Sequence, residues 1–111
     1  MDSSGISLTF SDQGTGPIVI LIHGITENAL AFSPLIKLLS PRFRVIALDC
    51  RGHGDSDKPR DPSAYGRNMV KDVRNLLIHL GIDQAYILGT SMGAEIALRF
   101  TTEYPKYVTK L

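Results

Sequence analysis

The sequence predicts an α/β protein in which a mostly parallel sheet carries helices on both faces. Three short runs, residues 18–22, 44–48 and 85–89, are apolar and rich in residues that favour strands. Continuous apolar runs of this kind are typical of strands buried on both faces of a parallel sheet. Helical patterns separate the runs and follow the last one, and this alternation is typical of parallel sheets with crossover helices.

The start of the chain predicts one further strand. ISLTF, residues 6–10, has strand-forming composition, and Gly14, Gly16 and Pro17 follow in a segment with turn chemistry. We therefore expect a hairpin-like entry into the sheet.

Three helices are expected between and after the apolar runs. Ser33 and Pro34 predict the N-cap and first residue of a short helix that ends before Pro41. Apolar residues at three- and four-residue steps predict the second: Met69, Val70, Val73, Leu76, Leu77 and Leu80. Gly81 is its stop signal. The third follows Ser91 and should be largely buried, because it has few polar positions.

Composition limits the function classes. The 111 residues carry 12 Lys and Arg against 11 Asp and Glu, a net charge of +1. This balance gives no reason to expect a nucleic-acid partner or an anionic membrane. A single domain of cytoplasmic location is expected, because neither a signal peptide nor a membrane-spanning segment is present. The single Cys50 cannot form an internal disulfide, and the sequence leaves the oligomeric state open.

Three loops should meet at one edge of the sheet. They are residues 23–25, 49–57 and 89–93, and each follows one of the predicted parallel strands. Sites in such sheets lie beyond the carboxyl ends of the strands. The last loop reads Gly-x-Ser-x-Gly, in which Gly89 and Gly93 allow a strand to turn sharply into a helix with Ser91 exposed. Ser91 is therefore a candidate nucleophile, and the alternative is a helix N-cap.

Together these segments resemble the N-terminal half of an α/β-hydrolase of the esterase and lactonase-like group. The resemblance is carried by HGI at 23–25, DCRGHGDSDKP at 49–59, LLIHLGI at 76–82 and GTSMGAEIAL at 89–98. It implies a serine nucleophile, a small acyl substrate and no cofactor.

The same resemblance implies a role for individual residues. Ser91 would be the catalytic nucleophile, and the backbone N–H groups of Ile25 and Met92 would form an oxyanion hole. The remaining implied residues support the elbow and its neighbouring loop: His23, Gly24, Gly89 and Gly93.

Other reactive side chains have structural explanations that we favour. His23 and His53 would shape loops, and His79 suits the last turn of its helix. The aspartates of the second loop alternate with glycines and a basic residue, so no metal is expected there: Asp49, Asp55 and Asp57. Cys50 should behave as a small apolar residue, and Glu95 with Arg99 should form a helix-surface ion pair.

The proton acceptor for Ser91 is missing from the chain. The catalytic residues of this fold follow the order serine, acid, histidine, but from Thr101 onward there is one carboxylate, Glu103, and no histidine. YVTKL at 107–111 resembles the opening of another strand. We expect residues 1–111 to be the N-terminal part of a single α/β-hydrolase domain, truncated after the elbow helix and inactive alone.

The leading hypothesis is a serine hydrolase that acts on an ester, lactone or similar acyl bond. The alternative is a noncatalytic binding or receptor-like protein that keeps the fold and the serine. A dinucleotide-binding domain is disfavoured, because Gly52-x-Gly54 follows a later strand and lacks a third glycine at position 57.

Overall fold

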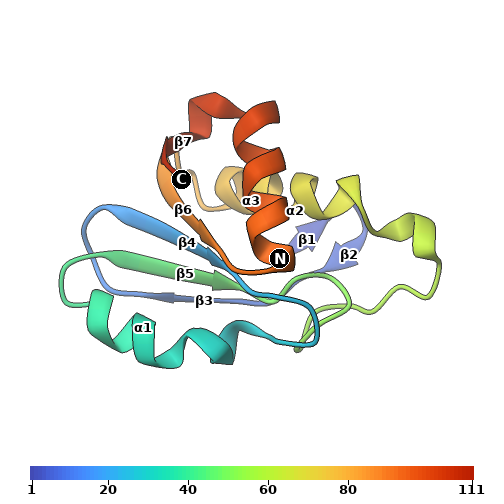
Figure 1. The fold of residues 1–111 in the computed structure, drawn as a ribbon, viewed down its shortest axis with the longest axis horizontal. Helices are drawn as coiled ribbons and strands as arrows, with labels where there is room; N and C mark the ends of the chain where they lie inside the picture. Colours follow the sequence, from blue (N-terminus) through green and yellow to red (C-terminus); the bar gives the residue numbers. More distant parts are fainter.

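The computed structural model describes residues 1–111 (Figure 1). Five strands form the main sheet in the order β3, β5, β4, β6, β7, and β1 pairs with β2 separately. The strands are β1 Asp2–Ser3, β2 Ile6–Ser7, β3 Phe10–Gln13, β4 Ile18–Ile22, β5 Arg44–Leu48, β6 Ala85–Gly89 and β7 Val108–Lys110. The helices are α1 Ser33–Leu39, α2 Arg67–His79 and α3 Met92–Glu103, with 3₁₀ turns η1 Ala29–Phe32, η2 Pro62–Ala64 and η3 Pro105–Tyr107.

The predicted parallel core of the sheet is confirmed. β4 pairs in parallel with both β5 and β6, and β6 pairs in parallel with β7. The bounds of β4, β5 and β6 coincide with the three predicted runs. Within the main sheet, only β3 runs antiparallel to its neighbour, β5.

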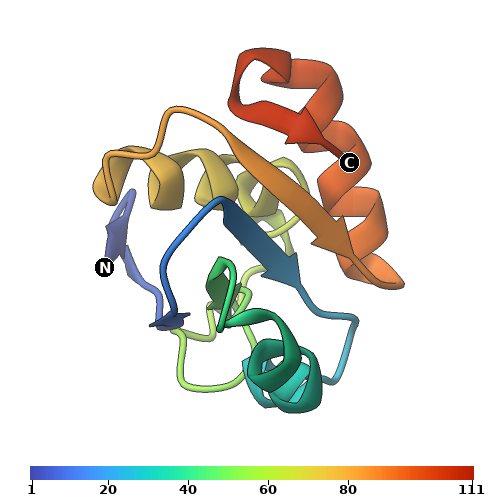
Figure 2. The ribbon, with the colours of Figure 1, turned by 90° about the vertical axis from the view of Figure 1, so that its left-hand side faces the viewer.

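Helices cover both faces of the sheet, but unequally. Figure 2 shows α1 on one side of the strands and α2 with α3 on the other. Ile20 and Ile22 of β4 belong to a buried cluster of 17 residues that includes side chains of α2 and α3. Val19 and Leu21, which alternate with them, belong to a cluster of six that includes Ile36 of α1. The α1 side of the sheet therefore has the smaller core.

The predicted first strand is wrong in its bounds and its partner. Residues 6–7 pair with β1 through a tight turn in which Ser4 has φ 52° and Gly5 has φ 87°. The strand that joins the main sheet begins only at Phe10. It pairs with β5, so the turn chemistry at 14–17 links strands that are not neighbours. A long-range hydrogen bond from the Ser3 hydroxyl anchors the terminal hairpin, and local composition does not encode it.

The start of the first helix also differs from the prediction. Ser33 lies inside α1, its hydroxyl donates to the Leu30 carbonyl, and Phe32 occupies the N-cap position. The capping side chain is Asn28, which accepts the Leu30 N–H at 2.9 Å and starts the preceding turn η1. Pro34 is in the first turn as predicted. A 3₁₀ turn thus takes over the capping role that the sequence assigned to Ser33.

The later helices follow the prediction with one difference. Gly81, with φ 67°, follows the C-cap of α2 and ends it. In α3 only one face is buried, and Leu98 on the other face is 56% exposed. The prediction of a largely buried α3 is therefore only partly right. None of the helices combines the length and the apolar character that a membrane crossing requires.

Candidate active site

Ser91 occupies a strained position between β6 and α3. Its backbone has φ 55° and ψ −119°, a conformation that costs a non-glycine residue about 1–3 kcal/mol. The residue is exposed, and its hydroxyl neither caps α3 nor forms any other hydrogen bond. Ser91 stands at the N-cap position, but its hydroxyl accepts no backbone N–H of α3. Backbone strain at an exposed, unpaired hydroxyl is typical of a functional position.

The two glycines of the elbow lie where no side chain fits. A Cβ atom on Gly93 would overlap the backbone carbonyl of Ile22 at the end of β4. A Cβ atom on Gly89 would overlap the Gly93 carbonyl in the first turn of α3. These close approaches hold the start of α3 against the ends of β4 and β6, with Ser91 at the turn.

The neighbouring turn, residues 23–27, is fixed by its own hydrogen bonds. The Gly24 carbonyl accepts the Glu27 N–H at 3.2 Å and lies 2.7 Å from Nδ1 of His23. The Gly24 N–H donates to Oε1 of Glu27 at 3.0 Å. Thr26 completes the turn with φ 64°. In a trans peptide the carbonyl and the next N–H point in opposite directions, so anchoring the Gly24 carbonyl also fixes the Ile25 N–H.

Two backbone amides near the elbow are unused. Neither the Ile25 N–H nor the Met92 N–H donates to a side chain or joins the hydrogen bonds of the turns, loops and caps. The two segments approach closely, because a Cβ atom on Gly24 would lie 3.0 Å from Cβ of Ser91. We call residues 22–27 and 89–93 together the rim. The rim therefore brings the Ser91 hydroxyl close to two segments that each offer a free amide, one of which contains Ser91 itself.

His23 is buried inside the rim and both of its ring nitrogens are engaged. Nε2 accepts the Cys50 N–H at 3.0 Å, which leaves Nδ1 to donate to the Gly24 carbonyl. Burial is the main reason that its pKa is lowered, and the His53 ring, 5.1 Å away between centroids, lowers it further. The neutral ring therefore links the turn 23–27 to the loop 49–57. It has no lone pair left for the Ser91 proton.

The other two histidines are also committed elsewhere. His53 places Nδ1 3.1 Å from the Arg51 carbonyl. His79 lies in the last turn of α2 and packs edge-on against Phe10 with ring centroids 6.2 Å apart. None of the three histidines forms a hydrogen bond with Ser91. No histidine of this chain therefore accepts the Ser91 hydroxyl proton in this structure.

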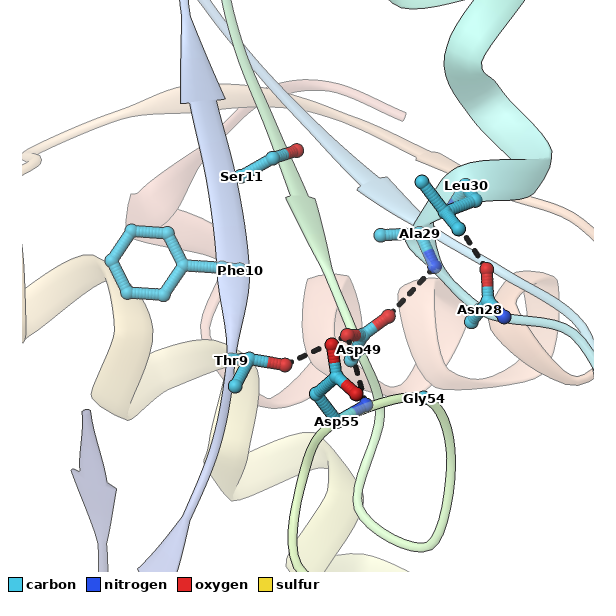
Figure 3. A pocket seen from close by; sticks show the side chains of 9 residues that line it. All are labelled: Thr9, Phe10, Ser11, Asn28, Ala29, Leu30, Asp49, Gly54 and Asp55. Carbon is cyan, nitrogen blue, oxygen red and sulfur yellow. Dashed lines mark hydrogen bonds between the residues drawn. The ribbon is translucent and has the colours of Figure 1, made fainter.

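Asp49 organises the second loop from its centre (Figure 3). Its carboxylate accepts the Ala29 N–H at 2.8 Å, the Thr9 hydroxyl at 2.7 Å and the Asp55 N–H at 3.3 Å. Burial alone would raise the Asp49 pKa, but these hydrogen bonds outweigh it and the pKa is lowered. An open cavity of about 290 Å³ lies beside this carboxylate. Asp49 therefore joins Thr9, just before β3, to η1 and the loop 49–57 as a structural acceptor.

Three other residues of the loop 49–57 also have structural roles. Arg51 is buried and donates two hydrogen bonds of 2.7 Å to Asp72 of α2. Asp57 accepts the Ser7 N–H at 2.8 Å. Burial raises the pKa of the Cys50 thiol to about 12, so it is an apolar group here. Each of these side chains has a structural partner or a structural reason for its place.

Glu27 was not singled out from the sequence, yet it lies beside the elbow. Its Oε1 is within 2.7 Å of the point that a Cβ on Gly24 would occupy, and Ser91 Cβ is within 3.0 Å of the same point. Only the turn brings this carboxylate to the site. The Gly-x-x-Glu spacing was the available signal, since a side chain three residues after a glycine can bond back to its N–H. By contrast, the predicted Glu95–Arg99 ion pair is present at 2.9 Å.

Comparisons with known proteins show the fold family of the chain. The family model of the alpha/beta hydrolase fold matches residues 17–111. The chain is 38% identical over 109 residues to 2-(acetamidomethylene)succinate hydrolase of Mesorhizobium japonicum, covering 97% of this chain and 38% of that protein. It is 35% identical to epoxide hydrolase 3 of Siraitia grosvenorii, covering all of this chain and 36% of that protein.

Two solved structures extend the likeness to three dimensions. An epoxide hydrolase from Bacillus megaterium, solved with an inhibitor, superposes with a TM-score of 0.95 at 29% identity, covering 100% of this chain and 39% of that chain. An epoxide hydrolase from Vigna radiata gives 0.94 at 28% identity, covering 97% and 36%. The chain spans between 36% and 39% of the length of these relatives. Its sequence, sheet order and elbow all identify it as a member of the α/β-hydrolase fold family.

Proposed function

We propose that this chain carries the nucleophile of a serine hydrolase that cleaves an ester, lactone or similar acyl bond. The observation that carries the proposal is Ser91, a strained and exposed residue whose hydroxyl has no partner. Its Oγ would attack the acyl carbon, and the leaving alcohol would depart with a proton. Water would then hydrolyse the resulting ester on Ser91 and restore the hydroxyl.

The identity of the nucleophile favours acyl bonds over epoxides. Several relatives are named epoxide hydrolases. A serine oxygen that opened an epoxide would form an ether, which water does not cleave under mild conditions. The same oxygen on an acyl carbon forms an ester, which water can hydrolyse. A catalytic cycle with Ser91 as the nucleophile can therefore be completed with acyl substrates.

The free amides of Ile25 and Met92 support the same reaction. In the proposed mechanism they stabilise the negative charge that develops on the acyl oxygen, and loss of one such donor typically costs about 3 kcal/mol. The fixed Gly24 carbonyl keeps the Ile25 N–H ready before substrate arrives. We further propose that the general base and its carboxylate are supplied beyond Leu111 in a longer protein, of which residues 1–111 are the N-terminal part.

Replacing Ser91 tests the proposal in the protein encoded by the complete reading frame. Ser91→Ala should lower kcat/KM for p-nitrophenyl butyrate by about 10⁴-fold or more, because the nucleophile is lost. The control is Ser63→Ala, an exposed serine in η2 and outside the rim. A fluorophosphonate probe should label Ser91 in the complete protein and leave residues 1–111 alone unlabelled.

Three outcomes would contradict the proposal. Ester turnover that survives Ser91→Ala would exclude Ser91 as the nucleophile. Hydrolysis of styrene oxide without ester turnover would exclude acyl specificity. Absence of any turnover, together with tight binding of small acyl compounds, would favour the noncatalytic alternative.

A further inference from the structure

We propose that Glu27 makes this site select against acyl groups that carry a negative charge, so that its substrates have neutral or cationic acyl groups. The inference rests on the proposed acyl transfer at Ser91 and adds the charge of the substrate to it. Glu27 is the carboxylate that the turn 23–27 holds against the elbow.

The position of the Glu27 carboxylate is fixed from both ends of the residue. Its backbone N–H donates to the Gly24 carbonyl at 3.2 Å, and its Oε1 accepts the Gly24 N–H at 3.0 Å. These two bonds close a ring over the turn. The carboxylate therefore cannot swing far from Ser91 without losing a hydrogen bond, although the residue as a whole is exposed.

No positive charge of the chain neutralises this carboxylate. Glu27 belongs to none of the four ion pairs. The neighbouring His23 ring is buried with a lowered pKa, and the nearby Asp49 is itself an acid with a lowered pKa. Lys58 donates its Nζ hydrogens to the carbonyls of Gly54 and Ser56. The turn beside the nucleophile thus presents an uncompensated negative charge.

A fixed charge this close to the reacting carbon discriminates between substrates. The acyl group must lie beside Ser91 Oγ, and a second negative charge on that group would face Glu27 across a site that substrate partly closes to water. Like charges at such separations lower the rate for the anionic substrate about five- to tenfold relative to a neutral one. A cationic acyl group would gain a similar factor.

Glu27→Gln removes the charge and keeps the turn. The Gln oxygen can still accept the Gly24 N–H, so the fold of residues 23–27 is preserved. The matched control is Glu103→Gln, which changes the net charge equally but lies at the far end of α3, paired with Arg67. The substrates are p-nitrophenyl butyrate and mono-p-nitrophenyl succinate, whose acyl chains are alike in length and differ in charge.

The complete protein should prefer the butyrate ester, and Glu27→Gln should raise the succinate-to-butyrate ratio of kcat/KM about five- to tenfold. Glu103→Gln should leave the ratio within about twofold of the parent. An unchanged ratio in an active Glu27→Gln protein overturns the inference while the proposed function stands. Two results would overturn the proposed function and this inference with it. One is a protein that turns over esters no faster than Ser91→Ala and shows no preference for butyrate; the other is the absence of any ester turnover.

Discussion

The rim and the outer edge of the sheet differ in how completely their groups find partners. At the rim, both ring nitrogens of His23 and both backbone groups of Gly24 are engaged, whereas the Ser91 hydroxyl and the N–H groups of Ile25 and Met92 are left free. We call a set of exposed apolar residues on β6, on α3 and after β7 the outer edge: Tyr86, Leu88, Leu98 and Leu111. There β7 pairs with only the start of β6, and two open cavities are lined mostly by apolar side chains.

The difference shows which parts of a sheet can be completed locally. The rim is built by short loops that close on themselves or on the next strand, so its partners lie within this chain. Burial of the outer edge requires a strand or helix that covers the full length of β6. In this chain Tyr86 of β6 is 38% exposed and Leu88 is 37% exposed. Changes at the rim should therefore cost stability, whereas changes at the outer edge should mainly alter association.

The largest expected effect is a substitution that opens the rim. Gly93→Ala should lower the free energy of unfolding by about 4 kcal/mol or more, because the new Cβ would overlap the Ile22 carbonyl at the end of β4. Gly81→Ala is the control, since its Cβ would meet nothing within 4 Å and only the positive φ of 67° is penalised. That change should cost about 1–2 kcal/mol. Urea denaturation followed by circular dichroism measures both, and equal losses would contradict the packing argument.

An intermediate effect is expected from pH, through His23. Its pKa is lowered in the fold, mainly by burial, so the unfolded chain takes up a proton first as pH falls. The stability that His23 contributes should be complete above about pH 6.5 and lost as pH falls below that value, with a slope of up to about 1.4 kcal/mol per pH unit. Asp49 has a lowered pKa as well, but its contribution is lost only below about pH 4.

The test of this pH dependence compares two histidine variants. Denaturation of His23→Gln between pH 7.5 and pH 5 should show a smaller slope than the parent, even though the variant is less stable throughout. His79→Gln, which changes an exposed histidine at the end of α2, is the matched histidine-to-glutamine variant. A parent slope in His23→Gln would assign the titration to another group.

The smallest effect on stability is expected at the outer edge. Leu98→Lys should change the free energy of unfolding by no more than about 0.5 kcal/mol, because Leu98 is 56% exposed on α3. Purified residues 1–111 should self-associate through this apolar surface, and the lysine should reduce that association. Sedimentation velocity at several concentrations measures it. A monomeric parent chain would show that the outer edge does not mediate self-association.

The three parallel strands could be predicted from the sequence because burial on both faces leaves a direct mark, a continuous apolar run. The N-terminal hairpin could not, since β1 and β2 have two residues each and the Ser3–Asp72 hydrogen bond spans 69 positions. The position of β3 beside β5 is likewise set by pairing across the sheet and not by local composition.

The candidate site shows the same division. Ser91 and its flanking glycines are visible in the sequence because a sharp strand-to-helix turn requires small residues at fixed spacing. Glu27 was missed, because its one signal, the Gly-x-x-Glu spacing from Gly24, is a single spacing in a polar loop and indicates no function by itself. Its place beside the elbow depends on the turn in which Thr26 has a positive φ. A threonine in the sequence does not predict this backbone conformation.

The reactivity of the Cys50 thiol can report how often the loops around it open. It is the only cysteine, it is 3% exposed, and a thiol with a pKa of about 12 is almost entirely protonated at neutral pH. A thiol-specific reagent can therefore react at an appreciable rate only in molecules whose loop 49–57 has come away from His23. The labelling rate of this one sulfur atom would read out how often the two loops separate, without any substrate and without any mutation.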